Sequence, residues 1–477
     1  MRRRRSVLAI ASLVGVAALV AGCSGAIDGR AVSIYDNPFT VAGLPATSGP
    51  SGPREGVPDA QLPVRGADGS AADVLATNAV DDIAAFWQSE YPRVFGGDFR
   101  PVTDLLSWDP DADRAQAPTF CGDNTHGFAN AGYCTRDGSI GWDRTVLLPS
   151  LIETFGPMSV VMVMAHEYGH AVQYGSGLAG DDDLTLVLEQ QADCFAGAYM
   201  RHVAQGDSRH FTLNTSDGLN SVMAAMVAVR DSDPNDPESV HGSAFERITA
   251  FQIGFTDGAK SCTKIDETDV LSRQAELPQQ FTTESDTGEM PVTEESVQLT
   301  VDSLQALFDL PQKPAVDFAG ADTGCPDAES TEPVSYCPAT NTIGVSMPEL
   351  IERGTPNPES GDEFDADVRG DFGAYVLVAS RFTLAAQAHA EKSLTEAKTA
   401  VRAACLSGAW TAATAVGEAG GLTLSPGDLD EAVSGLLSDG LMASDVNGNT
   451  VPSGFARVDA FRSGVLGGEQ ACENRYG

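Results

Sequence analysis

Basic residues are scarce in this sequence. Its 477 residues include 29 Lys and Arg against 67 Asp and Glu, so the formal net charge is -38 and the isoelectric point is near 4.3. Nucleic acids and anionic surfaces attract positively charged proteins. The charge therefore argues against nucleic acid as a partner and against direct docking on anionic lipid or anionic wall polymers.

The apolar run near the start is too short for an ordinary membrane span. It extends from Val7 to Val20 and follows the basic residues Arg2 to Arg5, which is typical of a signal peptide. The next residues resemble a bacterial lipobox, Val20-Ala21-Gly22-Cys23. That resemblance implies cleavage before Cys23 and lipidation of this residue; an ordinary signal peptide cleaved nearby is the alternative. We expect a signal peptide over residues 1–22 and a protein anchored at the extracytoplasmic face of the cell membrane by acyl chains.

The stretch between Ser24 and Ala71 has little from which to build a core. It is rich in Gly, Pro, Ser and Ala, as in Ala46-Thr47-Ser48-Gly49-Pro50. Such a composition buries too little apolar surface to offset the entropy lost on ordering the chain. Residues 23–71 are therefore predicted to form a flexible tether.

An H-E-x-x-H pattern, His166-Glu167-Tyr168-Gly169-His170, follows an apolar run. On a helix, His166 and His170 share one face because they lie four residues apart. Two imidazoles placed in this way can hold Zn²⁺, and Glu167 can act as general base to the water that the metal activates. A helix that carries two histidines without a metal is the alternative.

A second pair of candidate residues follows on the next predicted helix. Glu189 and Asp193 are four residues apart, and their neighbours are apolar or small. Carboxylates in such a segment are expected to be buried, where they need a partner; a solvated helix face is the alternative. A catalytic zinc site uses three protein ligands and one open position. Glu189 is the expected third ligand, and Asp193 is expected to hydrogen-bond the far nitrogen of a ligand histidine.

Together, residues 166–173 and 189–197 resemble the bacterial neutral zinc metallopeptidase family. The resemblance covers roughly residues 75–265. It implies a gluzincin-type site with zinc on His166, His170 and Glu189, and with Glu167 catalytic.

A later segment that begins at His241 also resembles an element of this family, although Glu246 stands where Gln is expected. His241 is expected to hydrogen-bond the tetrahedral intermediate of peptide hydrolysis. Capping of the following helix is the alternative.

The chain repeats itself. Residues 133–151, 161–173, 191–199 and 245–262 recur in the same order at 336–350, 375–387, 402–410 and 455–472. This self-similarity indicates an internal duplication; chance likeness of apolar segments is the alternative. In the second copy Ser380, Arg381 and Leu384 stand in place of the H-E-x-x-H residues, and Ala400 and Ala404 replace the two carboxylates. We therefore expect a degenerate pseudo-peptidase domain in which these substituted positions hold no metal and no zinc is bound.

The duplication also predicts how the cysteines pair. Without Cys23, eight cysteines remain, and an even set in an exported protein is typical of a disulfide framework. Bridges at corresponding places in both copies would be Cys121–Cys134, Cys194–Cys262, Cys325–Cys337 and Cys405–Cys472.

The predicted fold class is mainly α with a small β element, in two tandem zincin-like domains. Helices are expected near residues 74–91, 158–173, 182–202, 243–257 and 296–310, and a short strand near 139–148. The predicted boundaries are a zinc metallopeptidase domain over 72–265, a linker over 266–291 and the degenerate domain over 292–477. The sequence thus predicts a membrane-anchored zinc endopeptidase acting on peptide or protein substrates. The alternative is a non-catalytic cell-surface lipoprotein that serves as a scaffold or binding protein.

Overall fold

The computed structural model describes residues 37–180, 183–231, 240–274, 277–281, 288–357, 365–420 and 422–477. They belong to one unit that extends from Tyr35 to Gly477. The predicted signal peptide, Cys23 and residues 282–287 of the predicted linker lie outside the described residues. No helix among the described residues combines the length and the apolar character that a membrane crossing requires.

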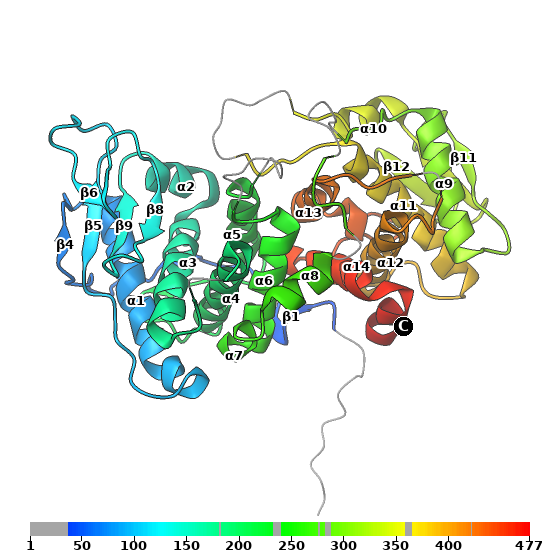
Figure 1. The fold of residues 1–477 in the computed structure, drawn as a ribbon. Coiled ribbons are helices and arrows are strands. Elements are labelled where there is room, and N and C mark those ends of the chain that lie inside the picture. Colours follow the sequence, from blue (N-terminus) through cyan, green and yellow to red (C-terminus); the bar gives the residue numbers. More distant parts are fainter. Residues whose placement is uncertain are drawn as a thin grey trace, which may run out of the picture. The chain divides into compact units, whose positions relative to one another are not determined.

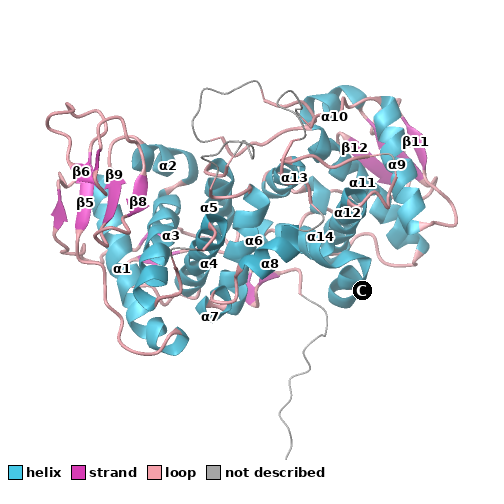
Figure 2. Cartoon of the chain, in the orientation of Figure 1, coloured by secondary structure: helices cyan, strands magenta, loops and turns pink. Residues whose placement is uncertain are grey.

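Helices dominate the structure and the strands are short (Figure 2). This confirms the predicted fold class, mainly α with a small β element. The α-helices are α1 (Ala71–Val94), α2 (Leu147–Phe155), α3 (Pro157–Ser176), α4 (Thr185–Ala204), α5 (Asp217–Ala228), α6 (Ala244–Asp257), α7 (Ala259–Cys262), α8 (Glu267–Gln274), α9 (Glu294–Phe308), α10 (Met347–Arg353), α11 (Asp371–His389), α12 (Ala397–Ala415), α13 (Asp428–Leu437) and α14 (Gly454–Tyr476). The strands are β1 (Thr40–Val41), β2 (Leu44–Pro45), β3 (Gly52–Pro53), β4 (Val64–Arg65), β5 (Leu105–Trp108), β6 (Thr119–Phe120), β7 (Asp123–Asn124), β8 (Ala131–Tyr133), β9 (Ile140–Asp143), β10 (Phe211–Thr212), β11 (Ala315–Asp317), β12 (Val334–Cys337) and β13 (Thr342–Val345).

A small sheet with the order β4-β5-β9-β8 stands beside α1 and α2 in the first half of the chain (Figure 1). Strand β5 is parallel to β4 and β9, and β8 pairs antiparallel with β9 at one edge. The predicted strand over 139–148 is shorter than expected. It ends at Asp143 because this carboxylate accepts hydrogen bonds from the backbone N–H groups of Val146 and Leu147 and so starts α2.

A sheet with the same pattern lies in the second half. Strand β11 is parallel to β13, and β12 pairs antiparallel with β13, as β5, β9 and β8 do in the first half. The order β11-β13-β12 therefore repeats the order β5-β9-β8. This recurrence supports the predicted duplication, which stays a prediction.

Two pairs of helices recur as well, and each is held close by glycines. A Cβ on Gly197 of α4 would collide with the backbone of Phe251 in α6, and one on Gly408 of α12 would collide with the backbone of Phe461 in α14. Such contacts let the helix backbones approach each other. Disulfides reinforce both arrangements: Cys194–Cys262 joins α4 to α7, the short helix that follows α6, and Cys405–Cys472 joins α12 to α14. With Cys121–Cys134 and Cys325–Cys337, all four predicted bridges are confirmed.

The second half buries the residues that stand where the first half has its candidate ligands. Ser380, Arg381, Leu384 and Ala400 are all fully buried. The guanidinium of Arg381 donates hydrogen bonds to Ser444 Oγ and to the backbone oxygens of Leu441 and Asp445. These four positions are thus enclosed in the core of the second half; that they hold no metal stays a prediction.

The two halves pack against each other. Phe245 N of α6 donates to Asp430 Oδ1 of α13 at 3.0 Å, and Gln252 Nε2 donates to Phe455 O of α14 at 3.0 Å. The rings of Phe255 and Phe455 lie 5.0 Å apart. Most buried apolar residues of the two halves belong to one hydrophobic cluster; Leu106, Trp108, Phe120 and Cys134 form a second, smaller one. The two predicted domains, 72–265 and 292–477, therefore share one continuous core.

The prediction of a flexible tether is wrong for residues 37–71. Strand β3 pairs with β10, and Ser51 Oγ accepts a hydrogen bond from Asn214 N at 3.0 Å. Thr47 O accepts hydrogen bonds from the backbone and the hydroxyl of Ser216. The inference from composition was wrong because this segment needs no core of its own. Its backbone and hydroxyl groups form hydrogen bonds with the rest of the chain, and these bonds keep it ordered.

The predicted linker also contains regular structure. Helix α8 occupies Glu267–Gln274, and Arg273 on it donates to Gln190 of α4 at 2.5 Å. Helix α8 is thus attached to the first half, whereas Glu289 accepts a hydrogen bond from Asp371 N of the second half.

Candidate metal centre

Helices α3 and α4 bring the four residues of the sequence prediction together. His166 and His170 lie on α3, and Glu189 and Asp193 lie on α4. Gly169 faces α4, where an added Cβ would lie 3.0 Å from Ala192 Cα. A larger residue at 169 would push the helices apart and move Glu189 away from the histidines.

Three donor groups converge between these helices. The Nε2 atoms of His166 and His170 are 3.2 Å apart, and the Glu189 carboxylate lies 3.2 Å from the first and 3.4 Å from the second. Tetrahedral zinc with bonds of about 2.0–2.1 Å places its ligand atoms roughly 3.3 Å apart. The spacing of the three groups therefore fits a zinc ion between them.

Glu189 gives a second indication of fit. Its Oε2 is buried and, among the described residues, has no hydrogen-bond partner of good geometry, although it lies 3.2 Å from His166 Nε2. A buried carboxylate oxygen without a partner is unfavourable, whereas coordination of a cation would satisfy it. Two imidazole nitrogens and one carboxylate are also a donor set typical of catalytic zinc sites.

His166 is oriented from behind by Asp193. Its Nδ1 lies 2.7 Å from Asp193 Oδ1, and Asp193 also accepts hydrogen bonds from Nε and Nη2 of Arg247 on α6, both at 3.0 Å. All three side chains are buried. This arrangement keeps the proton on Nδ1 and turns the Nε2 lone pair toward the metal position.

Gln173 orients the other histidine. His170 Nδ1 lies 2.9 Å from Gln173 Oε1, while Gln173 Nε2 donates to Leu188 O and to Gln191 Oε1. These donations fix the amide so that its oxygen faces His170. Neither Gln173 nor Arg247 was predicted to have a role; three-residue spacing after His170 is the signal that could have identified Gln173.

The electrostatic field at the centre favours a positive charge. Burial by itself lowers the pKa of His166, but the neighbouring carboxylates of Asp193 and Glu189 raise it to about 10. Burial raises the pKa of Glu189, yet His166 and then His170 and His241 hold it well below its usual range. The same field that stabilises a proton on His166 would stabilise a metal cation.

Glu167 lies on the side of α3 that faces β8. It is half-buried, and its Oε2 accepts a hydrogen bond of 2.8 Å from Tyr133 N at the end of β8. The ring of Tyr133 lies 5.9 Å from that of Tyr174, which is 37% exposed. The sheet edge thus sets the position of the predicted general base.

His241 stands apart from the three donor groups. Its side chain is 46% exposed and its Nδ1 lies 3.2 Å from Asp231 Oδ1. The alternative that His241 caps the following helix is wrong, because Ser243 caps α6 in a capping box with Glu246. Its charge is the smallest of the influences that lower the pKa of Glu189. Its role toward a substrate stays a prediction.

Two large cavities lie away from the three donor residues. One of about 710 Å³ is lined by α5, α10 and α13, and one of about 540 Å³ is lined by α6, α8 and the start of α13. Neither lining includes His166, His170 or Glu189. The candidate centre is identified by the geometry of its three donor groups, because the volume of a cavity does not indicate whether its lining binds a metal.

The chain is similar to three mycobacterial proteins. They are Uncharacterized protein Mb2605 of Mycobacterium bovis and Uncharacterized proteins MT2651 and Rv2575 of Mycobacterium tuberculosis, each 30% identical over 212 residues that cover 39% of this chain and 67% of the relative. The chain belongs to their family. Their names state no activity. Membership of this family therefore gives no information on a reaction, and any activity has to be inferred from the candidate metal centre. No family model and no solved structure matches the chain.

Proposed function

We propose that this protein is a zinc-dependent endopeptidase at the extracytoplasmic face of the membrane, anchored by a lipid on Cys23. The observation that carries the proposal is the convergence of His166 Nε2, His170 Nε2 and the Glu189 carboxylate at 3.2–3.4 Å. The four disulfides add support for an oxidising compartment outside the cytoplasm.

The residues of the centre have separate tasks in this proposal. His166, His170 and Glu189 would hold the zinc ion, which supplies Lewis acidity and lowers the pKa of water. Glu167 accepts a proton from the attacking water and returns it to the leaving amine. The bond from Tyr133 N keeps its carboxylate in place. His241 would donate a hydrogen bond to the oxyanion.

A cleavage assay tests the activity. Purified protein is incubated with a diverse peptide pool, and products are identified by mass spectrometry. We expect cleavage by the wild type, loss after a zinc chelator, recovery with added zinc, and at least about a hundredfold loss in Glu167→Gln. Glu153→Gln on the exposed face of α2 is the matched control and should cleave normally. Equal cleavage by wild type and Glu167→Gln would refute the assigned base.

A second function is favoured by the cavity of about 710 Å³, which is separate from the candidate centre. In this alternative the protein is a cell-surface scaffold or binding protein without catalysis. The same assay distinguishes them, since a scaffold that binds zinc would leave the whole peptide pool intact.

A further inference from the structure

A group of acidic side chains gathers where the second half begins. Glu289 precedes α9, Asp371 is the first residue of α11, and Glu431 lies in the first turn of α13. One carboxylate oxygen from each of these residues lies within 4.8 Å of the other two. The fold thus assembles three carboxylates from distant parts of the sequence.

Two of these three carboxylates are buried. Asp371 and Glu431 are each only 6% exposed, and Asp428 beside them is 5% exposed. None of the described ion pairs involves Asp371, Asp428 or Glu431. Burying several carboxylates together without a cation is unfavourable, because desolvation and mutual repulsion add.

Helix capping accounts for only part of this arrangement. Glu431 Oε2 accepts a hydrogen bond from Gly373 N at 3.0 Å, and Glu289 Oε2 accepts one from Asp371 N at 3.2 Å, so both carboxylates cap α11. The side chain of Asp371 has no such function. Its Oδ1 is buried and has no hydrogen-bond partner among the residues that the structure describes.

The pKa values agree with a shortage of positive charge. Burial, and then the carboxylate of Glu289, raise the pKa of Asp371 to about 7. Burial also raises the pKa values of Asp428 and Glu431 well above their usual range, and neighbouring carboxylates add to both shifts. A bound cation would remove this repulsion.

The backbone leaves room for the carboxylates. A Cβ at Gly370 would collide with the carboxylate of Glu431, so a side chain at this position would displace the group. Glu289 and Glu431 also line the cavity of about 540 Å³, which gives an ion a route from solvent.

We propose that Glu289, Asp371 and Glu431 form a second metal site, which binds a hard divalent cation, with Ca²⁺ as the best match. All three donors are oxygens, the ligands that Ca²⁺, Mg²⁺ and Mn²⁺ prefer. Oxygens on opposite sides of Ca²⁺ lie about 4.6–5.2 Å apart, for bonds of roughly 2.3–2.6 Å. Separations within 4.8 Å therefore let one Ca²⁺ reach all three.

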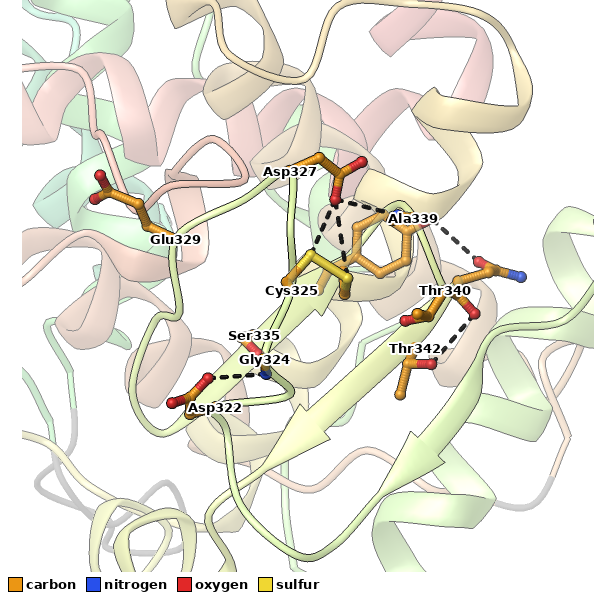
Figure 3. Close-up of a disulfide and its surroundings, with 12 residues drawn as sticks. Asp322, Gly324, Cys325, Asp327, Glu329, Ser335, Ala339, Thr340 and Thr342 are labelled. Atoms are coloured by element: carbon orange, nitrogen blue, oxygen red, sulfur yellow. Dashed lines mark hydrogen bonds between the residues drawn. A yellow bond between two sulfur atoms is a disulfide. The ribbon is translucent and has the colours of Figure 1, made fainter.

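Another group with possible ligand atoms, Cys325, Asp327 and Cys337, does not support a metal site. Figure 3 shows Asp327 beside the disulfide that joins the two cysteines. Their sulfur atoms are bonded to each other, so no thiolate is available.

The cation would hold together elements on which the first metal centre depends. Asp430, next to Glu431, accepts a hydrogen bond from Phe245 N of α6 and lies 3.5 Å from Arg230 Nε. Helix α6 also carries Arg247, which bonds Asp193. Fixing the start of α13 therefore fixes the end of α6 that it touches.

Calorimetric titration of the zinc-saturated mature protein with CaCl₂ tests the proposal. In buffer with enough salt to suppress diffuse binding, we expect one saturable site and a melting temperature that rises with Ca²⁺. Glu289→Gln and Glu431→Gln should each abolish saturable binding and the thermal shift. Glu289 is exposed, so its variant keeps the fold; circular dichroism checks both variants.

Glu469→Gln, an exposed substitution on α14, is the control and should bind Ca²⁺ like the wild type. Absence of a saturable site in the wild type would overturn the proposal. Binding that persists unchanged in Glu289→Gln and Glu431→Gln would overturn it too. Neither result depends on peptide cleavage, so this site and the proposed activity can fail separately.

Discussion

Arg247 donates two hydrogen bonds of 3.0 Å to the buried carboxylate of Asp193. Asp193 in turn lies 2.7 Å from His166 Nδ1, so α6, α4 and α3 are joined by one line of polar contacts. The orientation of a predicted zinc ligand therefore depends on a residue more than fifty positions away in the sequence.

Replacing Arg247 by Lys should weaken the polar contacts between Arg247, Asp193 and His166. Lys cannot donate two parallel bonds, so Asp193 would keep a buried charge with a poorer partner. We expect the free energy of unfolding to fall by about 3 kcal/mol and zinc affinity to fall about tenfold. Urea unfolding and competition with a zinc indicator measure the two effects. Arg209→Lys, whose side chain is 65% exposed, is the control and should change neither. An Arg247→Lys protein with wild-type zinc affinity and stability would contradict this account.

Gln173→Leu tests the orientation of His170. The substitution removes the amide oxygen that lies 2.9 Å from His170 Nδ1, so the imidazole can rotate or change tautomer. Zinc affinity should fall roughly 10–100-fold. Gln470→Leu on the exposed face of α14 should leave it unchanged. If Gln173→Leu binds zinc as tightly as the wild type, the amide has no part in holding the ring.

The two disulfides of the first half should differ in their contribution to stability. Cys194–Cys262 closes a segment of 68 residues and Cys121–Cys134 one of 13 residues. On loop length alone, their removal should cost about 4 and about 3 kcal/mol respectively, because the longer loop loses more entropy when closed. Denaturant unfolding of the two double Cys→Ala variants measures this difference. A larger loss from the shorter loop would show that contacts near the sulfur atoms outweigh chain entropy.

Cys23→Ala tests the lipid anchor. Without this thiol, no acyl chain can be attached at the predicted site, so the mature protein should move from the membrane fraction to the soluble fraction. Cell fractionation and immunoblotting detect the change, and Ser24→Ala serves as the control. Membrane retention of Cys23→Ala after a carbonate wash would count against the lipobox.

The sequence alone predicted which residues come together in the candidate centre, because these residues occur in pairs at helical spacing. His166 and His170 are four residues apart, as are Glu189 and Asp193, and helix geometry brings each pair to one face. The repeated blocks also predicted the disulfides, since a bridge such as Cys405–Cys472 must correspond to one in the first half. Both predictions used local spacing or internal comparison.

Contacts between distant residues could not be predicted in this way. Arg247 and Gln173 were absent from the predicted site because their partners are set by how helices pack. His210 is another example: it is only 3% exposed and lies 3.3 Å from Asp81, a residue of α1 that is far away in the sequence. The carboxylates of Asp371 and Glu431 are 60 positions apart and meet only in the folded chain. The prediction for residues 37–71 was wrong for a related reason. This segment is ordered by contacts with distant residues such as Asn214.

The zinc content of the purified mature protein and of its Glu189→Ala variant tests the central claim most directly. Measured by inductively coupled plasma mass spectrometry, the wild type should carry one zinc per chain, and so should Glu167→Gln and the exposed control Glu153→Ala. Glu189→Ala should retain almost none, because only His166 and His170 would remain as ligands. Full zinc occupancy in Glu189→Ala would contradict the account.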